Sequence, residues 1–232
     1  MIPYSDGIPA RRFPWVNVAL IAANFAVFVF YELPDPEGAV KQASFYACNV
    51  DHACHMGYPW GISWITAMFL HGSWDHILGN MWFLAIFGKN VEDAFGKLGY
   101  LVFYFAGGFA AMLLQTAMSL LFGSPSDAQV PCLGASGAIA AVMGAYFVIY
   151  PSSSIRTLVL WFPVSIPAWL YLGGWFIYQF FEGNSALVAG KSGGSGVAFF
   201  AHVGGFLFGA LITGLLVSSG RVVARTPQWY ET

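Results

Sequence analysis

The feature that most constrains this chain is a series of long apolar segments separated by few charged residues. Of its 232 residues, 58% are hydrophobic and only 9% are charged. A soluble domain carries about 25% charged residues, so a soluble protein of this length could not cover its surface with so few. The composition therefore predicts a polytopic membrane protein and excludes a soluble globular enzyme or a disordered chain. The net charge of −2 argues against a nucleic-acid binder, which needs a basic patch for phosphates.

Six apolar segments approach the length of about 20 residues that a membrane-spanning helix needs. We expect them at 15–31, 74–88, 98–122, 132–150, 157–181 and 197–218, within one domain that covers residues 1–232. Arg11 and Arg12 precede the first segment as in a signal peptide, but no small-residue cleavage site follows, so we interpret it as a span. Pro163 and Pro167 should distort the fifth span, and segment 190–196 should be a flexible loop. The sequence thus predicts an all-α bundle of six transmembrane helices.

The positive charges predict how this bundle is oriented. If the N-terminus is inside, seven of the nine Lys and Arg residues lie inside, whereas Lys41 and Lys191 lie outside. Because positive loops stay on the cytoplasmic side, we expect both termini inside. The outer loop 32–73 holds Trp60 and Trp64 in an apolar stretch, which indicates a segment at the membrane interface. We expect a multi-pass protein of the cell membrane.

Three groups of polar residues fall within or next to the predicted spans, where such residues are costly and usually functional. The groups are His71-x4-His76-x3-Asn80, Gly134-Ala-Ser136-Gly137 and Ala201-His202-x2-Gly205. The second, fourth and sixth spans run in the same direction, so all three groups should lie near the outer ends of their helices. We expect Ser136 a few residues and His202 about six residues into their helices, at similar depth. The coincidence predicts one shared site.

The residue types limit the chemistry of such a site. Histidine is the usual base that turns a serine into a nucleophile, which predicts that His202 activates Ser136. The side chains of His76 and Asn80 and the Ser136 amide could stabilise the resulting oxyanion. No Asp or Glu lies within the spans near His202, so the site would hold a dyad rather than a triad.

Small residues should let the fourth and sixth helices approach closely enough for this pair to meet. Ala201, Gly205 and Gly209 form a ridge on the sixth helix, and the fourth helix offers a comparable surface of Gly137, Ala140, Ala141 and Gly144.

The three motifs together resemble those of rhomboid intramembrane serine proteases, in the family's order and spacing. The resemblance implies that Ser136 is the nucleophile and His202 the base, and that His76, Asn80 and the Ser136 amide form the oxyanion hole. It implies a supporting role for His71, which should hold the outer loop, and a structural role for Glu92. Gly134, Gly137 and Gly205 belong to the same motifs and should support the site.

The sequence departs from the family at one position. In some relatives an aromatic residue one turn after the serine packs on the catalytic histidine, whereas this chain has Ala140 there. Either another group, such as a neighbouring aromatic residue, must then orient His202, or its ring is held less firmly. Trp175 and Gln179 lie on one face of the fifth span, where Gln179 either lines the substrate entrance or packs in the core.

The outer loop also contains Cys48-x3-His52-x-Cys54-His55, which has the residue types of a zinc site but no common zinc spacing. A Cys48–Cys54 disulfide or two free thiols are simpler interpretations, and Cys132 is expected to be a packing residue. We expect no metal and no cofactor.

The sequence therefore predicts a serine endopeptidase that cuts transmembrane protein substrates near the outer face of the bilayer. One alternative is a rhomboid-like protein that binds membrane clients without cutting them. The other is a small-solute transporter, which should carry charged residues at mid-depth, where this chain has none.

Overall fold

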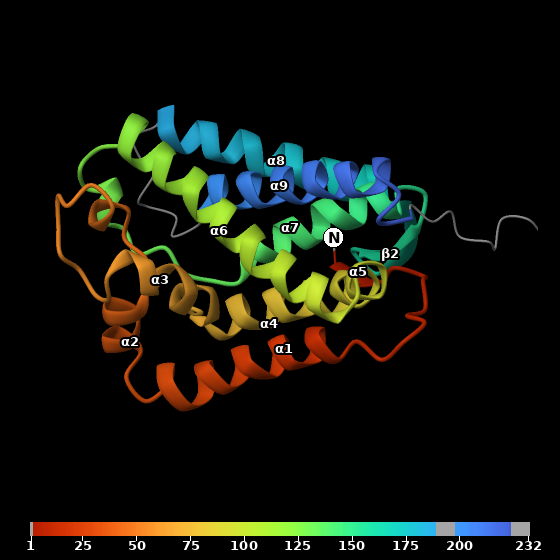
Figure 1. Ribbon diagram of the computed structural model, residues 1–232, viewed down its shortest axis with the longest axis horizontal. Helices are drawn as coiled ribbons and strands as arrows, with labels where there is room; N and C mark the ends of the chain where they lie inside the picture. The colour runs from red at the N-terminus through yellow and green to blue at the C-terminus, as the bar shows by residue number, and fades with distance from the viewer. Residues whose placement is uncertain (1, 189–197, 224–232) are drawn as a thin grey trace, which may run out of the picture.

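A computed structural model describes residues 2–188 and 198–223 (Figure 1). The predicted loop 190–196 and the first residue of the sixth predicted span lie outside the described residues. The described chain is mostly helical and carries one small sheet. Its helices are α1 (Trp15–Val27), α2 (Pro36–Ala43), α3 (Trp60–Thr66), α4 (Trp74–Phe83), α5 (Lys89–Phe95), α6 (Lys97–Phe122), α7 (Ser136–Ile149), α8 (Ala168–Val188) and α9 (Phe199–Ser218). Its strands are β1 (Ile2–Ser5), β2 (Ser154–Val159) and β3 (Phe162–Pro167).

Helix α7 lies at the centre of the bundle. Every residue from 137 to 146 is buried, and α4, α6 and α9 surround the helix (Figure 1). In the figure α4, α7 and α9 run from left to right, whereas α1, α6 and α8 run the other way. The N-terminal ends of α4, α7 and α9 therefore lie at the same end of the bundle, as the sequence predicts.

Three helical segments of the described chain are long and apolar enough to cross a membrane, namely Trp15–Glu32, Lys97–Phe122 and Phe199–Ser218. The first comprises α1 and a π-helical turn at Phe28–Glu32, and it agrees with the predicted span 15–31. Helix α6 agrees with 98–122. The second predicted span, 74–88, corresponds to α4 and a π-helical turn at Leu84–Gly88. The total of six spans stays a prediction.

The fifth predicted span is wrong in its first half, and with it the prediction of an all-α chain. Helix α8 begins at Ala168 rather than at Thr157, and the preceding residues form the β2–β3 hairpin. Strand β2 also pairs with β1 at the start of the chain, which makes a sheet of order β1-β2-β3. Pro163 and Pro167 do not kink a helix but lie in β3, the edge strand, where a missing N–H is tolerated.

The fourth and sixth predicted spans begin too early. Cys132 is extended and exchanges two backbone hydrogen bonds with Phe45, at 2.8 and 3.0 Å. Gly134 has a φ of +118°, a conformation that favours glycine and that breaks any helix begun at Cys132. Ser136 is therefore the first residue of α7 rather than a few residues into it. His202 is the fourth residue of α9, not about the sixth.

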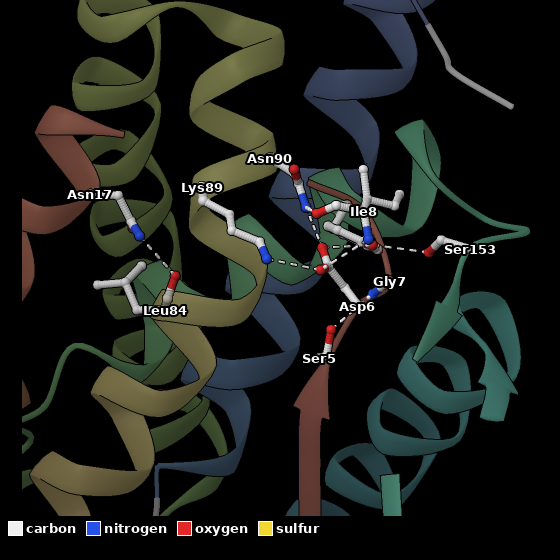
Figure 2. A network of polar contacts seen from close by, with 10 residues as sticks. Ser5, Asp6, Gly7, Ile8, Asn17, Leu84, Lys89, Asn90 and Ser153 are labelled. Atoms are coloured by element: carbon white, nitrogen blue, oxygen red, sulfur yellow. Dashed lines mark hydrogen bonds and ion pairs between the residues drawn. The ribbon is translucent and has the colours of Figure 1, made fainter. Parts of the chain in front are cut away.

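At the opposite end of α7 from Ser136, two buried carboxylates link segments that are distant in the sequence. Asp6 has no exposed surface and accepts from Tyr146 Oη at 3.1 Å. It also forms an ion pair with Lys89 at 3.0 Å and accepts from the Asn90 side chain (Figure 2). Glu92 accepts the backbone N–H groups of residues 16 and 17 at 3.1 and 2.8 Å, in the first turn of α1. A carboxylate there satisfies free amides and suits the helix dipole, which agrees with the structural role expected of Glu92.

Candidate active site

Ser136 and His202 face each other across the contact between α7 and α9. The distance from Ser136 Oγ to His202 Nε2 is 2.8 Å, a normal hydrogen bond. The two residues are 66 positions apart in the sequence, so the fold brings them together. The sequence predicts that Ser136 and His202 lie close enough to form a hydrogen bond, and the structure places them so.

Glycines make this contact possible. A methyl group built on Gly205 would overlap the carbonyl oxygen of Gly137, and one built on Gly209 would overlap the carbonyl oxygen of Ala141. From the other side, a methyl group on Gly144 would overlap the carbonyl oxygen of Phe206. The two backbones touch directly, which confirms the close approach predicted from the small residues.

His76 and Asn80 lie one turn apart on α4, beside the loop that leads into Ser136. A methyl group built on Gly134 would lie 2.9 Å from His76 Nε2 and 3.7 Å from Asn80 Nδ2. Gly134 therefore leaves open a space that both nitrogens border. Within the described chain, the buried Asn80 Nδ2 has no hydrogen-bond partner. A buried donor without a partner is costly, and a ligand oxygen in this space would satisfy it.

His71 is fully buried and supports His76 rather than contacting Ser136. Its backbone N–H donates to Glu32 Oε2 at 2.8 Å, which ties the outer loop to the end of the first span. Its ring packs edge-on against His76 with the ring centroids 5.1 Å apart. Burial, and secondly the neighbouring His76, lower the pKa of His71 to about 3. These contacts fit the supporting role that the sequence predicts.

Acidification should destabilise the protein through His71. In the unfolded chain His71 binds a proton near pH 6.5, whereas in the folded protein its pKa is about 3. Below about pH 6.5 the unfolded state therefore binds more protons, and stability should fall as the pH drops toward the folded pKa. The melting temperature of purified protein in detergent, followed from neutral to acidic buffers, should fall less steeply for His71→Asn than for the wild type. If the melting temperatures of the wild type and of His71→Asn fell in parallel as the pH dropped, His71 would not be a cause of the acid destabilisation.

Two residues of α8 hold the other side of His202. Gln179 Oε1 lies 3.0 Å from His202 Nδ1, and the ring of Trp175 packs against the imidazole at a tilt of 37°, with the centroids 5.7 Å apart. Sequence reasoning placed both residues on one face but did not connect them to His202. The signal was present, because Gln179 is a single amide within an apolar stretch and Ala140 supplies no ring.

The outer-loop cysteines form a Cys48–Cys54 disulfide, which selects one of the interpretations left open by the sequence. Within residues 2–188 and 198–223, no three His, Cys, Asp or Glu side chains are grouped in a way that could hold a metal ion. Cys132 is a free thiol that packs against Met112, with the sulfurs 3.5 Å apart.

The described chain is a helical bundle with a short buried helix, α7, at its centre and a Ser–His pair at one end of that helix. Comparison with known proteins identifies the family. Residues 59–219 match the Rhomboid domain, which covers more than half of the chain. The chain belongs to the rhomboid family. All the proposed site residues fall within the matched range.

Individual relatives agree with this assignment. The chain is 30% identical to Rhomboid-like protein 11, chloroplastic, of Arabidopsis thaliana over 68% of its own length and 54% of the relative's. It is 31% identical to Presenilin-associated rhomboid-like protein A, mitochondrial, of Danio rerio over 65% of its length and 36% of the relative's. It is 28% identical to Rhomboid protein 1, mitochondrial, of Saccharomyces cerevisiae over 83% and 51%, respectively. The aligned part thus spans between about a third and just over half of these relatives.

Proposed function

We propose that this protein is an intramembrane serine endopeptidase in which Ser136 and His202 form a catalytic dyad. The observation that carries the proposal is the 2.8 Å contact between Ser136 Oγ and His202 Nε2 at the N-terminal end of the buried helix α7. A neutral imidazole nitrogen at this distance can accept the hydroxyl proton when the oxygen attacks a carbonyl carbon. No cofactor or metal is needed for this chemistry.

The reaction would proceed in two acyl-transfer steps. Ser136 Oγ bonds to the substrate carbonyl carbon while its proton passes to His202 Nε2, which gives a tetrahedral oxyanion. Collapse breaks the C–N bond, and His202 returns the proton to the departing amine. A water molecule, deprotonated by His202, then attacks the acyl-enzyme and releases the carboxylate product and free Ser136.

The oxyanion would lie in the space beside Gly134. His76 Nε2 and the unpartnered Asn80 Nδ2 border that space, and the Ser136 backbone N–H comes from the first residue of α7. Free N–H groups in the first turn of a helix and the helix dipole both favour negative charge there. Donors fixed in place before the reaction are the main source of transition-state stabilisation in acyl transfer.

The substrates would be other transmembrane proteins, cut near the outer face of the membrane. This assignment uses six spans with both termini inside, which puts the N-terminal ends of α4, α7 and α9 on the outer side. We propose the cell membrane as the location. An organellar membrane is the alternative, because the relatives described above carry chloroplastic or mitochondrial names.

Cleavage of defined substrates tests the proposal. Purified protein in lipid vesicles is incubated with a panel of single-span proteins, the cut sites are located by mass spectrometry, and a fluorophosphonate probe is applied in parallel. We expect cuts near one end of the substrate helix and labelling confined to Ser136. If the wild-type protein neither cleaves nor reacts with the probe, the catalytically silent client-binding alternative replaces this proposal.

Removal of one oxyanion donor should lower turnover strongly without unfolding the protein. Asn80→Ala and His76→Ala should each lower kcat by about 100–1000-fold, the usual cost of losing one such donor. The measurement is the cleavage rate at saturating substrate together with the melting temperature. Asn184→Ala is the control, because the Asn184 amide bonds to the Phe180 carbonyl of its own helix and should leave turnover unchanged. An Asn80→Ala protein with the wild-type kcat would remove Asn80 from the oxyanion hole.

A further inference from the structure

We propose that Gln179 is a positioning residue that holds the His202 ring in the tautomer and orientation needed to accept a proton from Ser136. The inference rests on the proposed function, because it takes Ser136 and His202 as the reacting pair. It assigns to α8 a role in the reaction that the three sequence motifs do not include.

Each nitrogen of the His202 imidazole has its own partner. His202 Nε2 lies 2.8 Å from Ser136 Oγ, and Nδ1 lies 3.0 Å from Gln179 Oε1. With the Gln179 amide oxygen on this side the amide accepts, and a neutral ring then carries its hydrogen on Nδ1. Nε2 then carries the lone pair, and it faces the serine hydroxyl. The contact with Gln179 thereby selects the one neutral tautomer that can act as a base toward Ser136.

Gln179 is a buried amide on α8. Only 7% of its surface is exposed, in a helix whose other face presents large apolar side chains. A buried amide is costly unless it is hydrogen-bonded, and Asn184 on the same helix bonds to its own helix at Phe180. Gln179 instead reaches across to another helix and ends on His202.

Aromatic side chains of α8 also contact α9 at and next to His202. Trp175, one turn before Gln179, packs on His202, and the next pair along the same contact is Phe176 on Phe206, with centroids 4.8 Å apart. Helix α7 offers no ring in this place, because Ala140 packs close to Gly205. Helix α8 thus contacts the imidazole twice, through the Trp175 ring and at Nδ1 through Gln179.

The charged and titratable groups around His202 determine how protonation of its ring would affect a pH–rate profile. His76 on α4 is the titratable group that acts on it electrostatically, and α7 contributes the neutral Ser136. From α6, Gln115 accepts the N–H of Ala201 beside it. On α8 the carboxylate is Glu182, three residues after Gln179. Both ring nitrogens are taken by neutral partners, so a carboxylate introduced at position 179 would be a new electrostatic partner.

Three variants of the full chain test the proposal. Gln179→Met keeps the length of the side chain but removes the acceptor, whereas Gln179→Glu keeps an acceptor and adds a charge. Phe176→Leu is the structural control, since it trims the adjacent contact of α8 with α9 at Phe206. For each, kcat and KM are measured across pH, and the ¹⁵N signals of the His202 ring are assigned by their loss in His202→Ala.

We expect Gln179→Met to lose about 10–100-fold in kcat with little change in KM, the range found when the hydrogen-bond partner that orients a metal-bound histidine is removed. Gln179→Glu should retain turnover, and the acid limb of its pH–rate profile should move to higher pH, because a carboxylate favours the imidazolium. Phe176→Leu should lower the melting temperature without moving the profile.

The proposal is overturned if Gln179→Met keeps the wild-type kcat and pH profile, or if the ring signals show hydrogen on Nε2 in the wild type. A wild-type protein without cleavage or probe labelling would remove the proposed protease function. In that case the ¹⁵N signals of the His202 ring would still show whether its hydrogen is on Nδ1, where Gln179 can accept it.

Discussion

Ser136→Ala, His202→Ala and the double variant are expected to lose turnover to the same extent. Each single change removes one half of a unit whose members act only together, so the second change should cost nothing further. We expect a loss of about a thousandfold or more, down to the residual rate that the oxyanion donors alone support. The measurement is cleavage of a reconstituted single-span substrate by protein purified to the same folded fraction.

Matched controls separate this effect from damage to the fold. Ser218→Ala changes a serine at the far end of α9, where the hydroxyl bonds to the Leu215 carbonyl. His52→Ala changes an exposed histidine of the outer loop. Both controls should retain turnover. Cleavage at the wild-type rate by a purified Ser136→Ala protein would refute the serine-protease proposal in this form.

The positions of Ser136 and His202 could be predicted because each depends on a local pattern. Small residues at i, i+4 spacing, such as Gly205 and Gly209, identify a helix face that can touch another backbone. The structure brings that face against Gly137 and Ala141. The one-turn spacing of His76 and Asn80 likewise fixes a shared face on α4 without any knowledge of the fold.

The β2–β3 hairpin could not be predicted from apolarity alone. Residues 157–181 read as one apolar run, and a short apolar strand cannot be told from the beginning of a buried helix by hydropathy. What separates them here is pairing between distant segments, because Ile2 and Pro3 lie opposite Leu158 and Thr157. The prolines were a usable signal, since two of them within five residues fit an edge strand better than a membrane helix.

The start of α7 and the partner of His202 were missed for the same reason. The extended segment before Ser136 is set by hydrogen bonds from Cys132 to Phe45 and from Gly134 to the Ala67 carbonyl, which are contacts with the outer loop. Gln179 was visible as a buried amide, but its bond to His202 depends on how α8 packs on α9. Local patterns thus identified the residues of the proposed dyad, whereas the contacts around them required the tertiary structure.

Gly205→Leu is expected to be the most damaging single change outside the reacting groups. Any side chain at this position would overlap the carbonyl oxygen of Gly137, a backbone atom that cannot turn away. Helices α7 and α9 would have to separate, which costs packing along both helices and lengthens the contact between Ser136 and His202. Overpacking in a core costs about 1–3 kcal/mol, and a clash with backbone should reach or exceed the upper end.

Gly214→Leu is the matched control on the same helix, because a methyl group built on Gly214 meets nothing within 4 Å. That substitution should leave turnover unchanged and should not destabilise the protein, since leucine favours the helical state more than glycine does. Melting temperature and cleavage rate are measured for both variants in the same vesicles. We expect Gly205→Leu to lose both stability and turnover, and Gly205→Ala to lie between it and the wild type. If Gly205→Leu were as stable and active as Gly214→Leu, direct backbone contact between α7 and α9 would not be what holds the dyad together.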